Sequence, residues 1–282
     1  MKAIIRYPGS KWSIAKWIIE HFPSDYEKMV YLEPFAGSGA VFFNKQPGAV
    51  ETINDLDSNV VNLFRVLRER PDDLRRALEL TPYSREEYNL AFAPCEDPLE
   101  KARRFIVRTT QAIGAKMDGK CGWRNHKQIK IGGTACKWNG VTETIEIAAV
   151  RLKGDTTHLV QIEHMDALKL IRRYNTPEAL IYCDPPYVRS TRKSGRLYSC
   201  EMTDDEHQEL LEIITHSQAK IVISGYESDL YNGYLKYWNK FTTEVHTTSS
   251  DVAHEVIWTN FQTPHRQLTL EEFCVDETEA FR

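Results

Sequence analysis

The sequence of 282 residues lacks the segments that mark export or a membrane anchor. It does not begin with a basic stretch followed by an apolar one, and none of its apolar runs approaches the length of a membrane span. We therefore expect a cytoplasmic protein. A hydrophobic content of 41% and a charged content of 27% are those of an ordinary globular protein with one or two domains.

Cysteine is sparse and irregularly placed. The six cysteines have no repeating spacing and no C-x-x-C pair, so the sequence has neither a disulfide framework nor the usual zinc-binding pattern. A zinc site built from Cys121, His126 and Cys136 would lack that pair, and we expect reduced thiols and no metal. The dinucleotide fingerprint G-x-G-x-x-G is missing as well, which counts against a dinucleotide cofactor.

What the sequence does contain is a strand, a glycine turn and a helix start near its beginning. An apolar strand at 30–32 runs into Glu33-Pro34-Phe35-Ala36-Gly37-Ser38-Gly39, and an apolar stretch follows. Gly37 and Gly39 permit a tight turn and a close approach of a ligand to the backbone. The next strand, 50–53, leads to Asp55, where doubly wound folds place the carboxylate that holds ribose hydroxyls. This combination predicts a cofactor site.

A second motif follows a buried strand in the second half of the chain. Residues 179–183 are apolar, as in the centre of a parallel sheet, and Asp184-Pro185-Pro186-Tyr187 comes next. The prolines end the strand and fix the backbone, so the Asp184 carboxylate, the Pro185 carbonyl and the Tyr187 ring gather where open α/β sheets bind ligands. The amino group of a nucleobase fits that set, with two acceptors for its N–H bonds and a ring on which the base stacks.

Three motifs in order carry a family resemblance. The segment Tyr7-Pro8-Gly9-Ser10-Lys11 precedes the two motifs above, and together they resemble the Dam-type adenine-N6 DNA methyltransferases (D12 class, alpha group). The closing Glu255-Val256-Ile257-Trp258-Thr259-Asn260-Phe261 is similar to the family's last strand. The similarity covers about 1–57 and 157–262, and Ser10 departs from it because the family often has a second glycine there. The resemblance implies a doubly wound, Rossmann-like methyltransferase fold of the α/β class, encoded by a bacterium or a phage and associated with the nucleoid through DNA.

The resemblance also implies the cofactor and its contacts. S-adenosylmethionine is the expected methyl donor, with Lys11 facing its methionine carboxylate and Asp55 holding its ribose. Asp166 stands where the family places an acid near the cofactor adenine, although it equally suits a helix cap. Lys11, likewise, would suit a solvated helix start. The expected cofactor contacts are Tyr7, Lys11, Glu33, Pro34, Phe35, Gly37, Ser38, Gly39, Asp55, Asp166 and Asp184, and the expected catalytic residues are Asp184, Pro185, Pro186 and Tyr187.

The chemistry explains why these residue types are needed. The exocyclic amine of adenine is a poor nucleophile because its lone pair is delocalised into the ring. Accepting its two hydrogens at the Asp184 carboxylate and the Pro185 carbonyl draws the nitrogen toward a tetrahedral, nucleophilic form. The transfer is then an in-line displacement without a covalent enzyme intermediate or a metal. The base has to leave the duplex and stack on Tyr187, which contributes on the order of 1–3 kcal/mol per base.

The net charge of −4 is unevenly distributed along the sequence. Residues 101–130 hold nine lysines and arginines against Asp118 alone, and a second basic run follows the tetrapeptide. Such a surface predicts phosphate contacts with double-stranded DNA, although charge runs such as 103–108 are also common on solvated helix faces. The expected DNA contacts are Lys116, Lys120, Arg124, His126, Lys127, Lys130, Arg189, Arg192 and Lys193.

The predicted elements place one domain inside another. Residues 1–57 and 157–282 are expected to form a discontinuous catalytic domain, and 58–156 a mainly helical target-recognition domain that binds DNA. We expect helices after Ser10, at about 59–69, and after the capping residues Ser84, Asp97 and Thr203. The region 114–140 has little periodicity and predicts a loop or hairpin. Strands are expected at 157–163, 179–183 and 220–224, with an antiparallel hairpin at 241–248 and 255–261.

Alternatives from other classes stay open at this point. Cytosine-N4 methylation uses a similar tetrapeptide, and Tyr187 and the motif order favour adenine. The family's protein-glutamine enzymes tend to have Asn where this chain has Asp184, and an RNA methyltransferase is a further candidate. A non-enzymatic binding module would be expected to have lost Asp184 or the glycine turn. We expect a monomer, with a dimer as the alternative, in a restriction-modification system, a phage or a host circuit.

Overall fold

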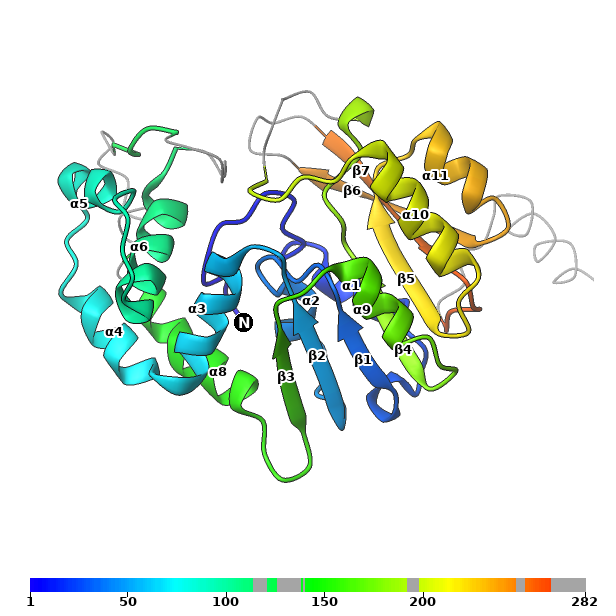
Figure 1. The fold of residues 1–282 in the computed structure, drawn as a ribbon, viewed down its shortest axis with the longest axis horizontal. Coiled ribbons are helices and arrows are strands. Elements are labelled where there is room, and N and C mark those ends of the chain that lie inside the picture. Colours follow the sequence, from blue (N-terminus) through cyan, green and yellow to red (C-terminus); the bar gives the residue numbers. More distant parts are fainter. Residues whose placement is uncertain (114–120, 126–137, 139, 192–197, 247–251, 265–282) are drawn as a thin grey trace, which may run out of the picture.

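A seven-stranded mixed sheet forms the centre of the computed structural model, which describes residues 1–113, 121–125, 138, 140–191, 198–246 and 252–264 (Figure 1). Its strand order is β3-β2-β1-β4-β5-β7-β6. The first five strands in this order are parallel to one another, and β7 pairs antiparallel with both β5 and β6. The strands are β1 Val30–Glu33, β2 Val50–Asn54, β3 Leu159–Glu163, β4 Ala179–Cys183, β5 Lys220–Gly225, β6 Asn239–His246 and β7 Val252–Thr259. The predicted α/β fold and its antiparallel hairpin are confirmed.

The two faces of the sheet are buried under different helices. Along β4, Leu180 and Tyr182 belong to one apolar core, and Ile181 and Cys183 to the other, as the alternation of side chains in a strand requires. Figure 1 shows α9, α10 and α11 on the face nearer the viewer. The helices that contribute to the two cores outside the insert are α1 Ala15–Glu20, α2 Ala40–Asn44, α9 Ala167–Arg173, α10 Asp204–Thr215 and α11 Asp229–Tyr234.

The inserted segment is helical, and side-chain caps define its helix starts. Ser84 and Asp97 accept backbone N–H groups at the starts of α5 and α6, as their sequence predicts. Thr203, outside the insert, forms a complete capping box with Glu206. The helices of the insert are α3 Ser58–Glu69, α4 Pro71–Glu79, α5 Arg85–Leu90, α6 Pro98–Gln111 and α8 Val141–Lys153.

The insert and the sheet share one apolar core. Phe105 of α6 and Ile145 of α8 belong to the same buried cluster as Tyr31 of β1, and both α3 and α8 contact β3. Figure 1 shows α3 and α8 standing beside β3, between the sheet and the other helices of the insert. The division at residues 57 and 156 therefore remains a prediction, and it cuts through a continuous core.

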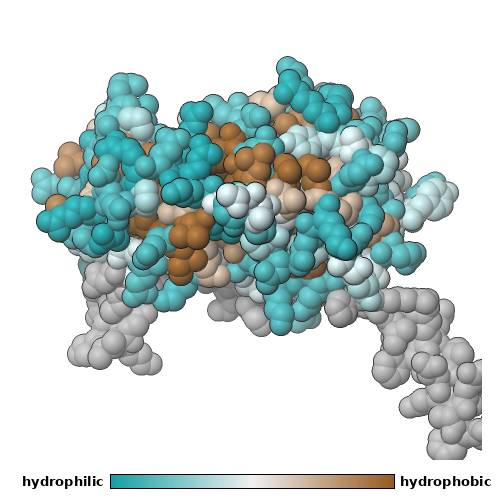
Figure 2. All heavy atoms as spheres, turned by 90° about the horizontal axis from the view of Figure 1, so that it is seen from below, coloured by the Kyte–Doolittle hydropathy of each residue, from teal (hydrophilic) through white to brown (hydrophobic). Residues whose placement is uncertain are grey.

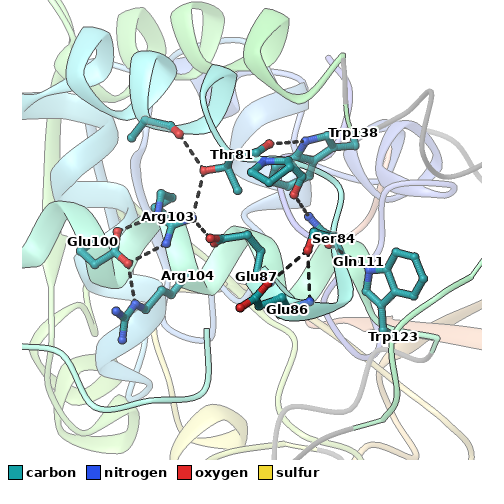
Figure 3. Close-up of polar contacts among 12 residues, drawn as sticks. Thr81, Ser84, Glu86, Glu87, Glu100, Arg103, Arg104, Gln111, Trp123 and Trp138 are labelled. Atoms are coloured by element: carbon teal, nitrogen blue, oxygen red, sulfur yellow. Dashed lines mark hydrogen bonds and ion pairs between the residues drawn. The ribbon is translucent and has the colours of Figure 1, made fainter. Parts of the chain in front are cut away.

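A polar network neutralises part of the basic run in the insert (Figure 3). Arg103 donates to both carboxylate oxygens of Glu100, to Glu87 Oε2 at 2.8 Å and to Thr81 Oγ1. Arg104 donates to Glu100 at 2.6 Å and to the Ala93 carbonyl. The excess of positive charge over 101–130 is thus smaller in space than along the sequence, because Glu87 and Glu100 lie outside that window.

Ser10 does not cap a helix, contrary to our expectation. The first helix starts only at Ala15, after a turn in which Ile14 N–H donates to the Lys11 carbonyl at 3.0 Å. The Ser10 hydroxyl lies 2.7 Å from the Ser38 hydroxyl instead. This contact matters for the site, because it holds the segment that contains Tyr7 and Lys11 against the glycine turn.

The end of the molecule at which the parallel strands begin is marked by exposed apolar side chains. Seen from below, apolar residues gather near the middle of this face among hydrophilic ones (Figure 2). Ile147 and Val150 of α8 and Leu159 of β3 are among the exposed large apolar side chains. No helix in the described residues is long and apolar enough to cross a membrane. The polar site described below lies at the opposite end of the strands.

Candidate active site

The segments that follow the parallel strands enclose a hollow of about 950 Å³, part of it open to solvent. Ten of the eleven expected cofactor residues line it, and the exception is Gly39. Pro186 also lines it, whereas Pro185 and Tyr187 do not. The lining residues expected from the sequence are Tyr7, Lys11, Glu33, Pro34, Phe35, Gly37, Ser38, Asp55, Asp166 and Asp184. A hollow at this edge of an open α/β sheet is the usual place for a ligand.

Asp55 and two glycines shape the turn after β1. Gly37 and Gly39 have φ of 49° and 66°, which favour glycine, and Gly37 N–H donates to Asp55 Oδ2 at 2.7 Å. The other oxygen of Asp55 accepts Asp57 N–H at 2.8 Å. A side chain on Gly37 would meet the Tyr7 ring at 2.9 Å, so this ring covers the turn. Gly39 is the N-cap of α2, where a side chain would meet Phe43, and its role is in packing.

Asn54 and Asp166 hold the neighbouring strand ends in place. The Asn54 amide donates to the carbonyls of Pro34 and Met165 and accepts Met165 N–H, so it joins the turns after β1 and β3. Asp166 accepts Lys169 N–H at 2.8 Å as the N-cap of α9, and it also lines the hollow. Both interpretations that the sequence allowed for Asp166 are therefore compatible with its position.

Asp184 is held from two sides. Lys11 Nζ donates to its two carboxylate oxygens at 2.7 and 2.9 Å, and the Ser224 hydroxyl donates to Oδ1 at 2.9 Å. Lys11 is only 3% exposed and donates to the Gly9 carbonyl as well. Burial lowers the pKa of Lys11, but the carboxylates of Asp184 and Glu255 raise it by more, so the ammonium stays charged. Asp184 retains 19% exposure and lines the hollow.

Tyr187 occupies a different position from the one we expected. Its ring is 8% exposed, lies 4.8 Å from Lys11 Nζ and packs against Tyr226 with ring centroids 4.4 Å apart. Its hydroxyl donates to Glu255 Oε1 at 2.6 Å. The open stacking face predicted for Tyr187 is absent in this conformation, because the ring is packed against Tyr226 and Lys11 and does not line the hollow.

The hollow has a strong bias of charge. Glu33 is 2% exposed, and its Oε2 accepts the Tyr31 hydroxyl and Phe42 N–H. Burial raises the pKa of Glu33 to about 8 and that of Asp55 to about 6. Within the part of the chain that the structure describes, Lys11 is the one basic residue of the lining, and it is already paired. The acidic lining residues are Glu33, Asp55, Asp166, Asp184, Glu201 and Glu206. Even with Glu33 protonated near neutral pH, acidic residues outnumber basic ones in the described lining, which suits a cationic ligand and disfavours a phosphate.

Several site residues were missed by reasoning from the sequence. Ser224 lies near the end of β5 and Tyr226 follows that strand, while Glu255 lies in the middle of β7, just before its apolar part. The available signal was the position near the end of β5 for Ser224 and Tyr226, and the ionisable side chain within a strand for Glu255. Tyr198, Cys200, Glu201 and Met202 also line the hollow, and no local pattern marks them.

Few of the expected DNA contacts lie in the described part of the chain. Arg189 is exposed in a short 3-10 turn. Arg124 donates to the carbonyls of Ala112 at 3.2 Å and Ile113 at 2.5 Å, so its side chain holds the segment after α6 and is poorly placed to read a base. The remaining expected contacts lie outside the described residues, namely Lys116, Lys120, His126, Lys127, Lys130, Arg192 and Lys193, and so does Cys136 of the zinc alternative.

Comparison with known proteins points in one direction. A family model described as D12 class N6 adenine-specific DNA methyltransferase matches residues 7–250. A DNA adenine methylase from Serratia marcescens is 21% identical over 266 residues, 88% of this chain and 92% of that protein. A type II methyltransferase from Lactococcus lactis subsp. cremoris is 30% identical over 205 residues, 69% of each chain. The solved structure of an rRNA methyltransferase from Streptomyces viridochromogenes aligns at 12% identity over 89% of this chain and 85% of its own, with a TM-score of 0.38.

Proposed function

Because the chain belongs to the D12 class of N6 adenine-specific DNA methyltransferases, we propose that it binds S-adenosylmethionine in the hollow and methylates adenines in double-stranded DNA that have left the helix. Membership of the family decides between the alternatives left open by the sequence, in favour of adenine in DNA. The observation that carries the proposal is the Asp184 carboxylate, which lines the hollow and is held there by Lys11 and Ser224.

The charge of the lining supports S-adenosylmethionine as the donor. The molecule carries a sulfonium, an ammonium and a carboxylate, hence a net charge of +1, and it has no phosphate. Among the described residues, six carboxyl groups line the hollow against one paired lysine. Asp55 and Asp166 would hold its ribose and adenine, and Glu33 and Asp184 its amino-acid end. Since Lys11 donates to Asp184 and Gly9, we assign to it the placement of Asp184, in place of the expected contact with the methionine carboxylate.

The chain contributes placement and electrostatics to the reaction. When bound, the donor supplies a methyl group that is already activated by its sulfonium. Asp184 and the Pro185 carbonyl accept the two hydrogens of the adenine amine, which localises the lone pair on the nitrogen. Lys11 and Ser224 fix the carboxylate in the orientation that this acceptance needs. Tyr187 is buried and its hydroxyl donates to Glu255, so we assign it to the support of Asp184.

Sequencing of the methylated base tests this function. DNA from a host that expresses the chain should contain N6-methyladenine at a defined site, and S-adenosylmethionine should bind the purified protein without DNA. A matched host that expresses the Asp184→Ala variant is the control. Methylcytosine in place of N6-methyladenine, or equal adenine methylation in both hosts, contradicts the proposal.

A further inference from the structure

Glu255 is a buried carboxylate beside the methyl-transfer site. Its side chain is 6% exposed, and its Oε1 lies 3.6 Å from Lys11 Nζ and accepts the Tyr187 hydroxyl at 2.6 Å. Lys11 is the residue that binds both oxygens of Asp184, and Tyr187 closes the tetrapeptide that Asp184 begins. Glu255 does not line the hollow and so acts through these two neighbours.

The charges of these groups matter for the reaction. An ammonium 2.7 Å from the Asp184 carboxylate would by itself cancel the charge of that carboxylate. A neutralised carboxylate is a weaker acceptor for the hydrogens of an amine and a weaker counter-charge for a cation. Glu255 is a second carboxylate close to the same ammonium. The net charge of Lys11, Asp184 and Glu255 is therefore −1 when both acids are ionised.

We propose that Glu255 is a positioning residue of methyl transfer, which keeps one negative charge at the site by sharing Lys11 with Asp184 and holds the tetrapeptide through Tyr187. The inference rests on the proposed role of Asp184. In the transfer, the N6 lone pair bonds to the methyl carbon, the carbon–sulfur bond breaks with its electrons on sulfur, and N6 is positive until it loses a proton to Asp184. A preorganised negative charge stabilises that developing cation.

The groups that face Glu255 determine its titration. They are Lys11 from the N-terminal segment, Asp184 and Tyr187 after β4, and Tyr226 after β5, while Thr243 lies opposite on β6. Burial raises the pKa of Glu255 above its ordinary 4.5, and Asp184 raises it further, whereas Lys11 and the Tyr187 hydroxyl lower it by less. As the pH falls, Glu255 therefore takes up a proton earlier than an ordinary glutamate, and the three groups lose their net negative charge.

The test compares single-turnover methyl transfer in matched variants, at saturating S-adenosylmethionine and DNA. Glu255→Gln keeps an oxygen for the Tyr187 hydroxyl and removes the charge, and we expect its rate to fall on the order of 100-fold. Glu244→Gln, an exposed position on β6, loses the same charge and should keep the parent rate. Tyr187→Phe removes the hydroxyl and keeps the charge, so it should lose less than Glu255→Gln.

The pH profile separates this role from a structural one. The parent should lose activity on the acid side as Glu255 is protonated, and Glu255→Gln should lack that limb. Glu244→Gln, the matched control outside the site, should keep it. If Glu255→Gln fails to fold in an unfolding titration, Tyr187→Phe decides, because it removes the hydroxyl that lowers the pKa of Glu255. An acid limb moved to higher pH in that variant supports the proposal, and an unmoved limb overturns it.

The remaining outcomes are also decisive. A folded Glu255→Gln protein with the parent rate between pH 6 and 9 overturns the inference. Asp184→Asn run in parallel separates the two proposals, because activity retained in that variant would refute the proposed role of Asp184, on which this inference rests. If Asp184→Asn is inactive while Glu255→Gln stays active, the inference about Glu255 is wrong and the proposed role of Asp184 stands.

Discussion

The guanidinium of Arg151 on α8 binds both carboxylate oxygens of Glu51 on β2, at 2.6 and 2.8 Å. Glu51 is fully buried and also pairs with the buried Lys45, while Arg151 donates to the Phe42 carbonyl and lies 3.9 Å from the Phe42 ring centre. The last helix of the insert is thus joined to the sheet by a buried ion pair in addition to the shared apolar core.

Removing this pair should destabilise the protein. Arg151→Met leaves the buried Glu51 with one cation and the Phe42 carbonyl without its donor, and we expect a loss of about 3–5 kcal/mol in the free energy of unfolding. Urea unfolding measures it. Arg172→Met is the matched control, because its pair with Glu209 is about half exposed and should contribute under about 1 kcal/mol. Equal, small losses in both variants would contradict the account.

Asp55 should affect both cofactor binding and the glycine turn. Asp55→Ala removes a proposed ribose contact, for which about 1.5–3 kcal/mol of binding free energy is expected. It also removes the acceptor for Gly37 N–H and Asp57 N–H. Calorimetry with S-adenosylmethionine and an unfolding titration should therefore both change. An unchanged affinity for S-adenosylmethionine would show that Asp55 does not contribute to cofactor binding.

Glu33 should make stability fall as the pH rises. Its pKa is about 8 in the folded protein against 4.5 for an ordinary glutamate, so the folded state binds more protons than the unfolded state between these values. The stabilisation is complete below pH 4.5 and is lost as the pH rises through about 8. Asp55, with a raised pKa of about 6, contributes with the same sign at lower pH. Urea unfolding at pH 6 and pH 9 should show a smaller difference in Glu33→Gln than in the parent, and an equal difference would contradict the assignment.

The lysines of the insert should contribute to DNA binding through phosphates. Lys127→Ala and Lys130→Ala should each lower the salt dependence of binding by about one unit of slope, about equally on all sequences and without changing donor affinity. Lys220→Ala is the control, because Lys220 begins β5, at the end of the strand away from the hollow. Titrations at several salt concentrations measure the slope. Unchanged slopes in both insert variants would show that these lysines do not contact phosphates. The next candidate for the DNA-binding surface would then be Arg189–Arg196.

Local signals predicted most of the fold. Capping residues such as Ser84 and Thr203 act within one turn, and the apolar strands are short and bounded, so their elements lie close to where the sequence places them. The hairpin strands were predicted two to three residues late, since strand 239–246 pairs with 252–259. The motifs likewise predicted the lining of the hollow, because parallel strands end at the same edge of a sheet.

Contacts between distant segments could not be predicted in this way. Lys11 was expected to face the cofactor, but its partner Asp184 is 173 residues away. Arg103 was counted as free positive charge, although Glu87, 16 residues earlier, neutralises it together with Glu100. The packing of Tyr187 depends on Glu255 and Tyr226, which come from other strands. Each of these contacts joins residues that only the folded chain brings within reach.

The most direct measurement of the central claim is single-turnover methyl transfer by Asp184→Asn. Asparagine keeps the size of the side chain and an acceptor oxygen but removes the charge that Lys11 and Ser224 hold in place. The account predicts a loss of at least about 100-fold in rate, with folding and DNA affinity retained. A folded variant that methylates adenine at the parent rate would contradict it.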